Sequence, residues 1–91
     1  MSYAMIRAVV VEWLDDQYHF GDADKLIGGK DELSFLDRAI LDSLGFVKLV
    51  VHLEDLYRIK IDRKNLTRVN FDGMKKIVTY VLSHKDYRGP R

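Results

Sequence analysis

The feature that most constrains this fold is the apolar surface of the segment 43–57, which covers more than one side of a helix. One stripe at helical spacing runs through Leu44, Val47, Val50 or Val51, and Glu54, and a second runs through Phe46, Leu49, Leu53, Leu56 and Tyr57. A helix with so wide an apolar surface needs neighbours on several sides. The segment therefore predicts a long helix at the centre of a small bundle.

The chain before this segment predicts one more helix and a long connection. The helix is expected to begin with Ser2 as its cap, to run to about Tyr18 and to end near Gly21. Its buried face is predicted to hold Met5, Ile6, Val9, Val10, Trp13 and Leu14. The connection from Gly21 to Asp42 is too rich in apolar residues for a free linker, so we expect a structured loop pinned to the core. The pinning residues would be Leu26, Ile27, Leu33, Phe35, Leu36, Ile40 and Leu41.

After residue 57 the pattern changes and then returns to helix. Ile59 and Ile61 alternate with charged residues, which predicts an extended segment, and Asn65-Leu-Thr predicts a short turn of helix through about residue 70. The last helix is expected to start near residue 70 or 72, with Gly73 in its first turn. Its inward residues would be Met74, Ile77, Val78, Val81 and Leu82. Together these elements predict an all-α four-helix bundle with a long first loop and a short third helix.

Length and composition limit the other possibilities. The 91 residues fit one domain, predicted to span 1–84 with a disordered tail at 85–91. The chain has no cysteine, which excludes disulfides and thiol chemistry, and it contains no apolar run long enough to span a membrane. The start of the chain does not resemble a signal peptide. We therefore expect a soluble, cytoplasmic protein and, by default, a monomer.

The charges are unevenly distributed along the chain. Residues 1–57 hold five Lys or Arg against eleven Asp or Glu, whereas residues 58–91 hold ten against three. The basic cluster comprises Arg58, Lys60, Arg63, Lys64, Arg68, Lys75 and Lys76. Its simplest interpretation is a solvated face. An alternative is a small helical module that binds nucleic acid, or another protein, through its basic C-terminal half.

Asp42-Ser43-Leu44 opens the central helix and is the candidate functional site. A serine there places its hydroxyl at the positive end of the helix dipole, where a phosphodiester is favoured. On these residues alone the simpler interpretation of Ser43 is a helix cap. A hydrolase nucleophile has little support, because no Gly-x-Ser-x-Gly surrounds it. His19, His52 and His84 lack the spacing of metal ligands, so we expect no metal site.

The residues after Ser43 extend this motif into a family pattern. Asp42-Ser43-Leu44 is followed in order by Val47-Lys-Leu-Val, Leu53-Glu-Asp, Tyr57 and Ile59-Lys-Ile61, and Asn65-Leu-Thr and Phe71 lead into the last helix. From about Phe35 to Leu82 the chain resembles the acyl and peptidyl carrier proteins, particularly stand-alone carriers that handle amino acids. This resemblance implies the helical bundle of the acyl-carrier-protein type.

The resemblance also implies a function in which the protein is not an enzyme. A phosphopantetheinyl transferase would move 4'-phosphopantetheine from coenzyme A onto Ser43, and an acyl or aminoacyl group would be held on the arm as a thioester. Asp42 would help position the serine, and Leu44, Phe46 and Val47 would contact partner enzymes. Those partners would be the transferase, an acyl- or amino-acid-activating enzyme and a downstream acyl-transferring enzyme. A carrier fold without an arm, which only stabilises another protein, is a further alternative.

Several positions depart from the pattern of fatty-acid carriers. Gly45 and Lys48 stand where acidic residues are frequent, Arg38 lies just upstream, and Asp62 replaces a common proline. From Ser43 to Arg58, Lys48 and Arg58 balance Glu54 and Asp55, so this helix is neutral overall. A partner that docks through a basic patch would lose part of its attraction. The resemblance therefore favours a specialised carrier over a general fatty-acid carrier.

Overall fold

Five α-helices surround one hydrophobic core in the computed structural model, which describes residues 3–19 and 21–87. They are α1 (Tyr3–Leu14), α2 (Ala23–Ile27), α3 (Ser43–Tyr57), α4 (Arg68–Phe71) and α5 (Met74–Ser83). A π-helical turn at Asp15–His19 extends α1, and a 3₁₀ turn at Arg63–Asn65 precedes α4. The described residues include no strand. The predicted all-α bundle with a long first loop and a short third helix is confirmed, with α2 as an additional short helix inside that loop.

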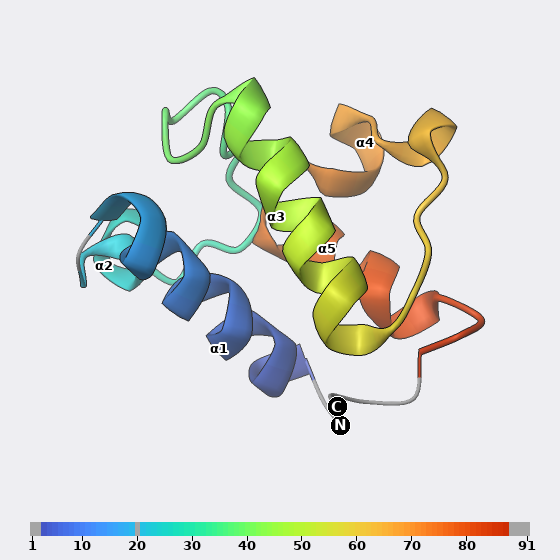
Figure 1. Cartoon of the computed structure of the whole chain (residues 1–91). Helices are drawn as coiled ribbons and strands as arrows, with labels where there is room; N and C mark the ends of the chain where they lie inside the picture. The colour runs from blue at the N-terminus through green and yellow to red at the C-terminus, as the bar shows by residue number, and fades with distance from the viewer. Residues whose placement is uncertain (1–2, 20, 88–91) are drawn as a thin grey trace.

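The helix α3 is central, as its wide apolar surface predicts. Figure 1 shows it crossing the middle of the molecule, with α1 on one side and α4 on the other, while α5 passes behind it and contacts α1. Leu49, Val50, Leu53 and Tyr57 of α3 are buried in the common core. The predicted bounds of this helix agree with the structure at both ends. Burial of these residues packs α3 against the core, and Ser43 is the first residue of this helix.

The first loop is pinned to the rest of the molecule by apolar and polar contacts. Phe35, Ile40 and Leu41 are buried in the core, as expected for a structured loop. Asp31 adds a contact that the apolar pattern did not indicate, since it accepts hydrogen bonds from Tyr3 Oη at 2.6 Å and from Arg7 Nε at 3.0 Å. The loop therefore holds a defined path up to the start of α3.

Some predicted details are wrong. Met5, Leu26 and Leu82, expected to face inward, are exposed by 50%, 49% and 37%. Residues 23–27 form a helix where a loop was expected, ended by Gly28 in the left-handed conformation with φ 64°. The predicted Ser2 cap lies outside the described residues.

The predicted helical turn after Asn65 is displaced in the structure. Asn65 instead ends the 3₁₀ turn, and α4 begins at Arg68 with Thr67 as its cap. The last helix starts at Met74, later than predicted. Gly73 is its N-cap rather than part of its first turn, with φ 140°.

The segment between α3 and α4 is extended, as its alternating pattern predicts. Ile59 and Ile61 are buried, whereas Arg58, Lys60 and Asp62 are exposed. Instead of a neighbouring strand, the carboxylate of Glu54 accepts the backbone N–H of Ile61 at 2.7 Å. Asp62, at the position of the common proline, accepts the backbone N–H of Lys64 and thereby starts the 3₁₀ turn.

The described end of the chain returns to the core. The ring of Tyr87 lies 5.5 Å from that of Tyr57, and Tyr87 is only partly exposed. Residues 88–91 of the predicted tail lie outside the described residues, so the domain boundary at residue 84 stays a prediction. Every described helix is too short or too polar to span a lipid bilayer.

Candidate functional site

The candidate site is the start of α3, where Ser43 is the first helical residue and is exposed. Asp42 precedes it in an extended conformation, and its Oδ1 accepts the backbone N–H of Gly45 at 2.7 Å. Asp42 is therefore the helix cap, and the alternative in which Ser43 caps the helix is wrong. Within the part of the chain that the structure describes, the Ser43 hydroxyl takes part in no hydrogen bond. The hydroxyl is thus presented to solvent at the positive end of a fifteen-residue helix.

The absence of a side chain at Gly45 lets the first loop and the turn after α1 pack closely against the start of α3. Gly45 is buried, and a Cβ built there would lie 2.6 Å from Leu41 Cδ1, 2.9 Å from Tyr18 Oη and 3.0 Å from Asp42 Oδ1. The departure from an acidic residue therefore has a steric cause, since no side chain fits without movement of these three groups. Tyr18 is brought to this place by the π-helical turn at the end of α1. This contact between Tyr18 and Gly45 was not predicted from the sequence.

We expect Gly45→Ala to lower the stability of the protein by about 1 kcal/mol. The overpacking costs roughly 1–3 kcal/mol, whereas alanine recovers up to about 1 kcal/mol of helix propensity. Chemical denaturation of the variant and the wild type measures the difference. Ser43→Ala, at an exposed position two residues away, serves as the control and should stay within about 0.5 kcal/mol. A Gly45→Ala protein more stable than the wild type would contradict the steric explanation.

A cavity of about 190 Å³, called here the serine-side cavity, lies beside Ser43. Its apolar wall includes Phe46 and Val47 of α3, and its other residues come from the first loop and from the α4 region. Those other residues are Leu36, Leu66, Thr67, Arg68, Phe71 and Asp72. Three predicted site residues, Ser43, Phe46 and Val47, thus line one cavity. The sequence did not indicate the residues of the first loop and the α4 region that line its other side.

Asp72 is the buried anchor of that second wall, with an exposed fraction of 3%. Its carboxylate accepts hydrogen bonds from Ser34 Oγ at 2.5 Å, from the Leu36 backbone N–H at 3.0 Å and from Arg68 Nε at 3.1 Å. Burial alone would raise the pKa of Asp72, but the hydrogen bonds from Ser34, Leu36 and Arg68 outweigh it and hold that pKa below its ordinary value. The guanidinium of Arg68 also contacts Asp37 at 2.8 Å. This network fixes the first loop against α4 on one side of the cavity.

The predicted partner contacts differ in exposure. Leu44 is exposed by 63% and Val47 by 42%, while Phe46 is half-buried and packs against the core. Phe46 and Val47 line the serine-side cavity, and Leu44 does not. Two exposed apolar side chains beside Ser43 form a surface that another protein can cover.

The basic cluster and the possible metal ligands do not form a second candidate site. Lys64, Arg68 and Lys75 of the basic cluster are exposed and are ion-paired with Asp62, Asp72 and Glu32 of the same chain. Among the residues that the structure describes, no group of His, Asp or Glu could hold a metal ion. The nucleic-acid alternative stays an untested prediction.

The geometry defines a class of protein: a small helical bundle that presents one serine at the start of its central helix, beside an apolar surface. That class is the one expected for a carrier protein. A comparison with known proteins gives a more particular likeness, because the chain is 45% identical over 49 residues to a D-alanyl carrier protein of Streptococcus uberis.

The matched region is 54% of this chain, and it spans 61% of the length of that relative. No protein-family model matches the chain, and no solved structure matches it with statistical significance. The similarity confirms the predicted resemblance to carrier proteins, and to an aminoacyl-type carrier in particular. The name of the relative is that of a carrier and not of an enzyme, in agreement with the prediction.

Proposed function

We propose that this protein is a carrier that holds an aminoacyl group on a 4'-phosphopantetheine arm attached to Ser43. The observation that carries the proposal is the exposed Ser43 hydroxyl at the first position of α3, with Asp42 as the cap. The similarity to a D-alanyl carrier protein supports the same assignment.

The residues at the start of α3 fit such an arm. A phosphodiester on Ser43 would lie at the positive end of the helix dipole, which stabilises negative charge. Asp42 turns its Oδ1 toward the Gly45 N–H at 2.7 Å, so the carboxylate is engaged by the helix while the hydroxyl beside it stays free. The serine-side cavity adjoins the hydroxyl and offers apolar contacts from Phe46 and Val47.

In the attachment reaction Ser43 Oγ attacks the phosphorus of coenzyme A that bears the pantetheine. The new bond is Oγ–P, the broken bond joins that phosphorus to the oxygen of the adenosine bisphosphate leaving group, and the hydroxyl proton passes to the transferase. Once attached, the arm supplies a terminal thiol on which an acyl group is held as a thioester. The chain itself orients the hydroxyl, keeps it in solvent and supplies the surface that partner enzymes contact.

The size of the serine-side cavity favours a small cargo. Its volume of about 190 Å³ is below the roughly 300–1,000 Å³ of typical small-molecule pockets, and Thr67, Arg68 and Asp72 give it a polar side. A long fatty-acyl chain exceeds this volume, whereas a short amino acid does not. D-alanine is the cargo in the name of the similar protein. We therefore propose an aminoacyl cargo, with an amino-acid-activating enzyme and a downstream acyl-transferring enzyme as partners of a monomeric carrier.

The test is to incubate the apo protein with coenzyme A and a promiscuous phosphopantetheinyl transferase and then to measure its intact mass. We expect a gain equal to one phosphopantetheinyl group. Trypsin cleaves after Arg38 and Lys48, so the modified peptide should be 39–48, which contains Ser43 as its sole serine.

Two serine variants make the result specific. Ser43→Ala should gain no mass while keeping its helical circular dichroism spectrum, because the side chain is exposed. Ser83→Ala, which removes an exposed serine on α5, should be modified as fully as the wild type. The proposal fails if the wild type stays unmodified or if Ser43→Ala gains the same mass.

A further inference from the structure

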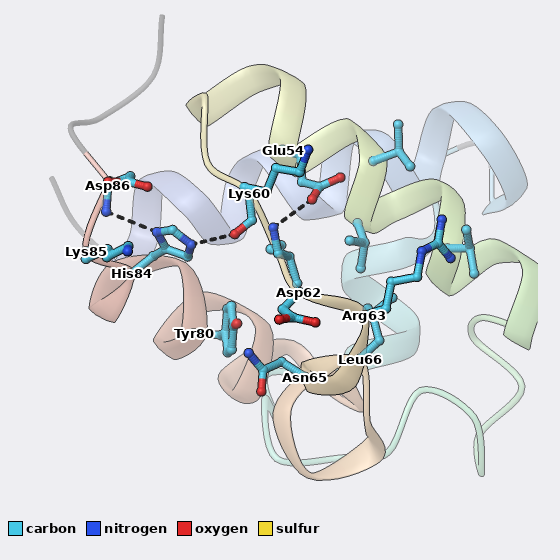
Figure 2. A pocket seen from close by; sticks show the side chains of 14 residues that line it. Glu54, Lys60, Asp62, Arg63, Asn65, Leu66, Tyr80, His84, Lys85 and Asp86 are labelled. Carbon is cyan, nitrogen blue, oxygen red and sulfur yellow. Dashed lines mark hydrogen bonds between the residues drawn. The ribbon is translucent and has the colours of Figure 1, made fainter.

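The end of α5 is joined to the segment after α3 through the side chain of His84. Its Nε2 lies 2.8 Å from the backbone oxygen of Lys60, and its Nδ1 accepts the backbone N–H of Asp86 at 3.0 Å. Figure 2 shows both contacts among the residues that line a hollow of about 870 Å³. This pair of hydrogen bonds is called here the His84 clasp. One imidazole ring thus connects two segments that lie 24 residues apart in the chain.

The hydrogen-bonding roles in the His84 clasp are fixed, because both partners of the ring are backbone groups. A carbonyl oxygen can only accept, and a backbone N–H can only donate. Nε2 must therefore carry the proton that faces Lys60, and Nδ1 must carry none where it faces Asp86. The clasp is made by this one tautomer of the neutral imidazole. A charged imidazole has a proton on each nitrogen, so it cannot accept the Asp86 N–H.

The clasp holds the residues after α5 in a turn against the core. The bond from Asp86 reaches back two residues, which is the geometry in which asparagine and aspartate side chains close a turn. Tyr87 follows, and its N–H donates to the His84 carbonyl at 3.1 Å. The ring of Tyr87 lies 5.5 Å from that of Tyr57, which is buried. Loss of the bond from Asp86 therefore removes one of the contacts that hold Tyr87 on Tyr57.

The charged groups that line the same hollow balance one another. They are Glu54 of α3, Lys60, Asp62 and Arg63 of the segment after it, and Lys85 and Asp86 after α5, and the other titratable group is Tyr80, whose ring centre lies 6.3 Å from that of His84. Glu54 is engaged by the Ile61 N–H, and Asp62 is engaged by the Lys64 N–H. A proton added to His84 therefore meets no excess of negative charge among the residues that line the hollow.

We propose that the His84 clasp is a pH-sensitive switch, closed while the imidazole is neutral and open when it is protonated. A histidine ordinarily changes charge between about pH 5 and 8. Since the closed clasp needs the neutral ring, it is complete at the upper end of this range and is lost as the pH falls. Opening frees the Asp86 N–H and weakens the contact of Tyr87 with Tyr57. Neither state requires a group on Ser43.

The test is a titration of the full ¹⁵N-labelled chain between about pH 5 and 8, followed by NMR. At the upper end, the imidazole nitrogen resonances of His84 should show the proton on Nε2. As the ring becomes charged, the nuclear Overhauser contacts between Tyr57 and Tyr87 should weaken. The protection of the Asp86 amide against hydrogen exchange, corrected for the intrinsic rate at each pH, should fall about fivefold, as expected for the loss of one hydrogen bond.

Two asparagine variants make the result specific. His84→Asn replaces Nδ1 by an amide oxygen that can accept the Asp86 N–H and that does not become protonated in this range. The turn should therefore persist in this variant, and its dependence on pH should disappear. His52→Asn, which removes a histidine of α3, should leave the pH dependence of the turn unchanged.

Four results would overturn the proposed switch. The first is a neutral His84 that carries its proton on Nδ1. The second is a Tyr87 that stays on Tyr57 throughout the titration of the ring, as it would if the Asp86 carboxylate accepted the added proton. The third is a His84→Asn chain that responds to pH as the wild type does. The fourth is a His84→Asn chain in which Tyr87 is released at every pH, because the bond to Lys60 would then be the one that holds the segment.

Discussion

Gly73→Ala is expected to lower the free energy of unfolding by about 4 kcal/mol. Gly73 has φ 140° and ψ 158°, a region that is essentially restricted to glycine. A Cβ there would also lie 2.7 Å from the backbone oxygen of Leu33, which cannot turn away as a side chain can. The loss is a large share of the roughly 5–14 kcal/mol expected for a domain of this size. Denaturant titration and thermal unfolding, with a decrease in Tm of about 20 °C, measure it.

The control for this prediction is Gly29→Ala. Gly29 also has a positive φ of 74°, but no atom lies within 4 Å of its would-be Cβ. That substitution should cost about 1 kcal/mol, the price of the left-handed conformation alone. Equal losses for the two variants would show that the close approach of Leu33 to Gly73 has no energetic effect.

Asp72→Ala is expected to destabilise the protein by about 3 kcal/mol, because it leaves the donors of Ser34 and Leu36 without their acceptor. Loss of the network should also free the first loop beside Ser43. The serine-side cavity would then lose its fixed wall. Denaturant titration gives the stability, and amide hydrogen exchange at Leu36 reports the loop.

The effect of Asp72 should depend on pH with a defined sign. Its pKa is lowered in the folded chain, so its contribution is complete above the unfolded value of about 3.9 and is lost as the pH falls through the folded value. The difference in stability between wild type and Asp72→Ala should therefore be full at pH 7 and shrink below about pH 4. Asp37→Ala, which removes a 70% exposed carboxylate from the same network, should cost only about 0.5 kcal/mol. A difference that does not change with pH would contradict the role of the Asp72 charge.

The sequence predicts those parts of the fold that depend on local periodicity. The bounds of α3 follow from its two apolar stripes, and the burial of Ile59 and Ile61 follows from alternation with charged neighbours. The exposure of Ser43 follows from its place at the helix start. In these cases each residue's environment is set by its own segment.

The parts that could not be predicted depend on contacts between distant segments. Asp72 and Ser34 are 38 residues apart, and nothing in either local pattern indicates that they meet. Gly73 was expected in the first turn of the last helix, because its close approach to Leu33 is visible only after the loop has been placed. The helix α2 is only five residues long, too short to show a full period of the apolar pattern. Tertiary packing decides each of these features.

The division of roles between Asp42 and Ser43 has a thermodynamic consequence. Since the Asp42 carboxylate closes the first turn of α3, conversion of the neighbouring hydroxyl into a phosphodiester takes no hydrogen bond away from the helix. Closure of the first turn of α3 therefore does not require any group on Ser43. Under the proposed function, the bare chain would fold before it meets a transferase, and a chain stripped of its arm would keep the capped start of α3.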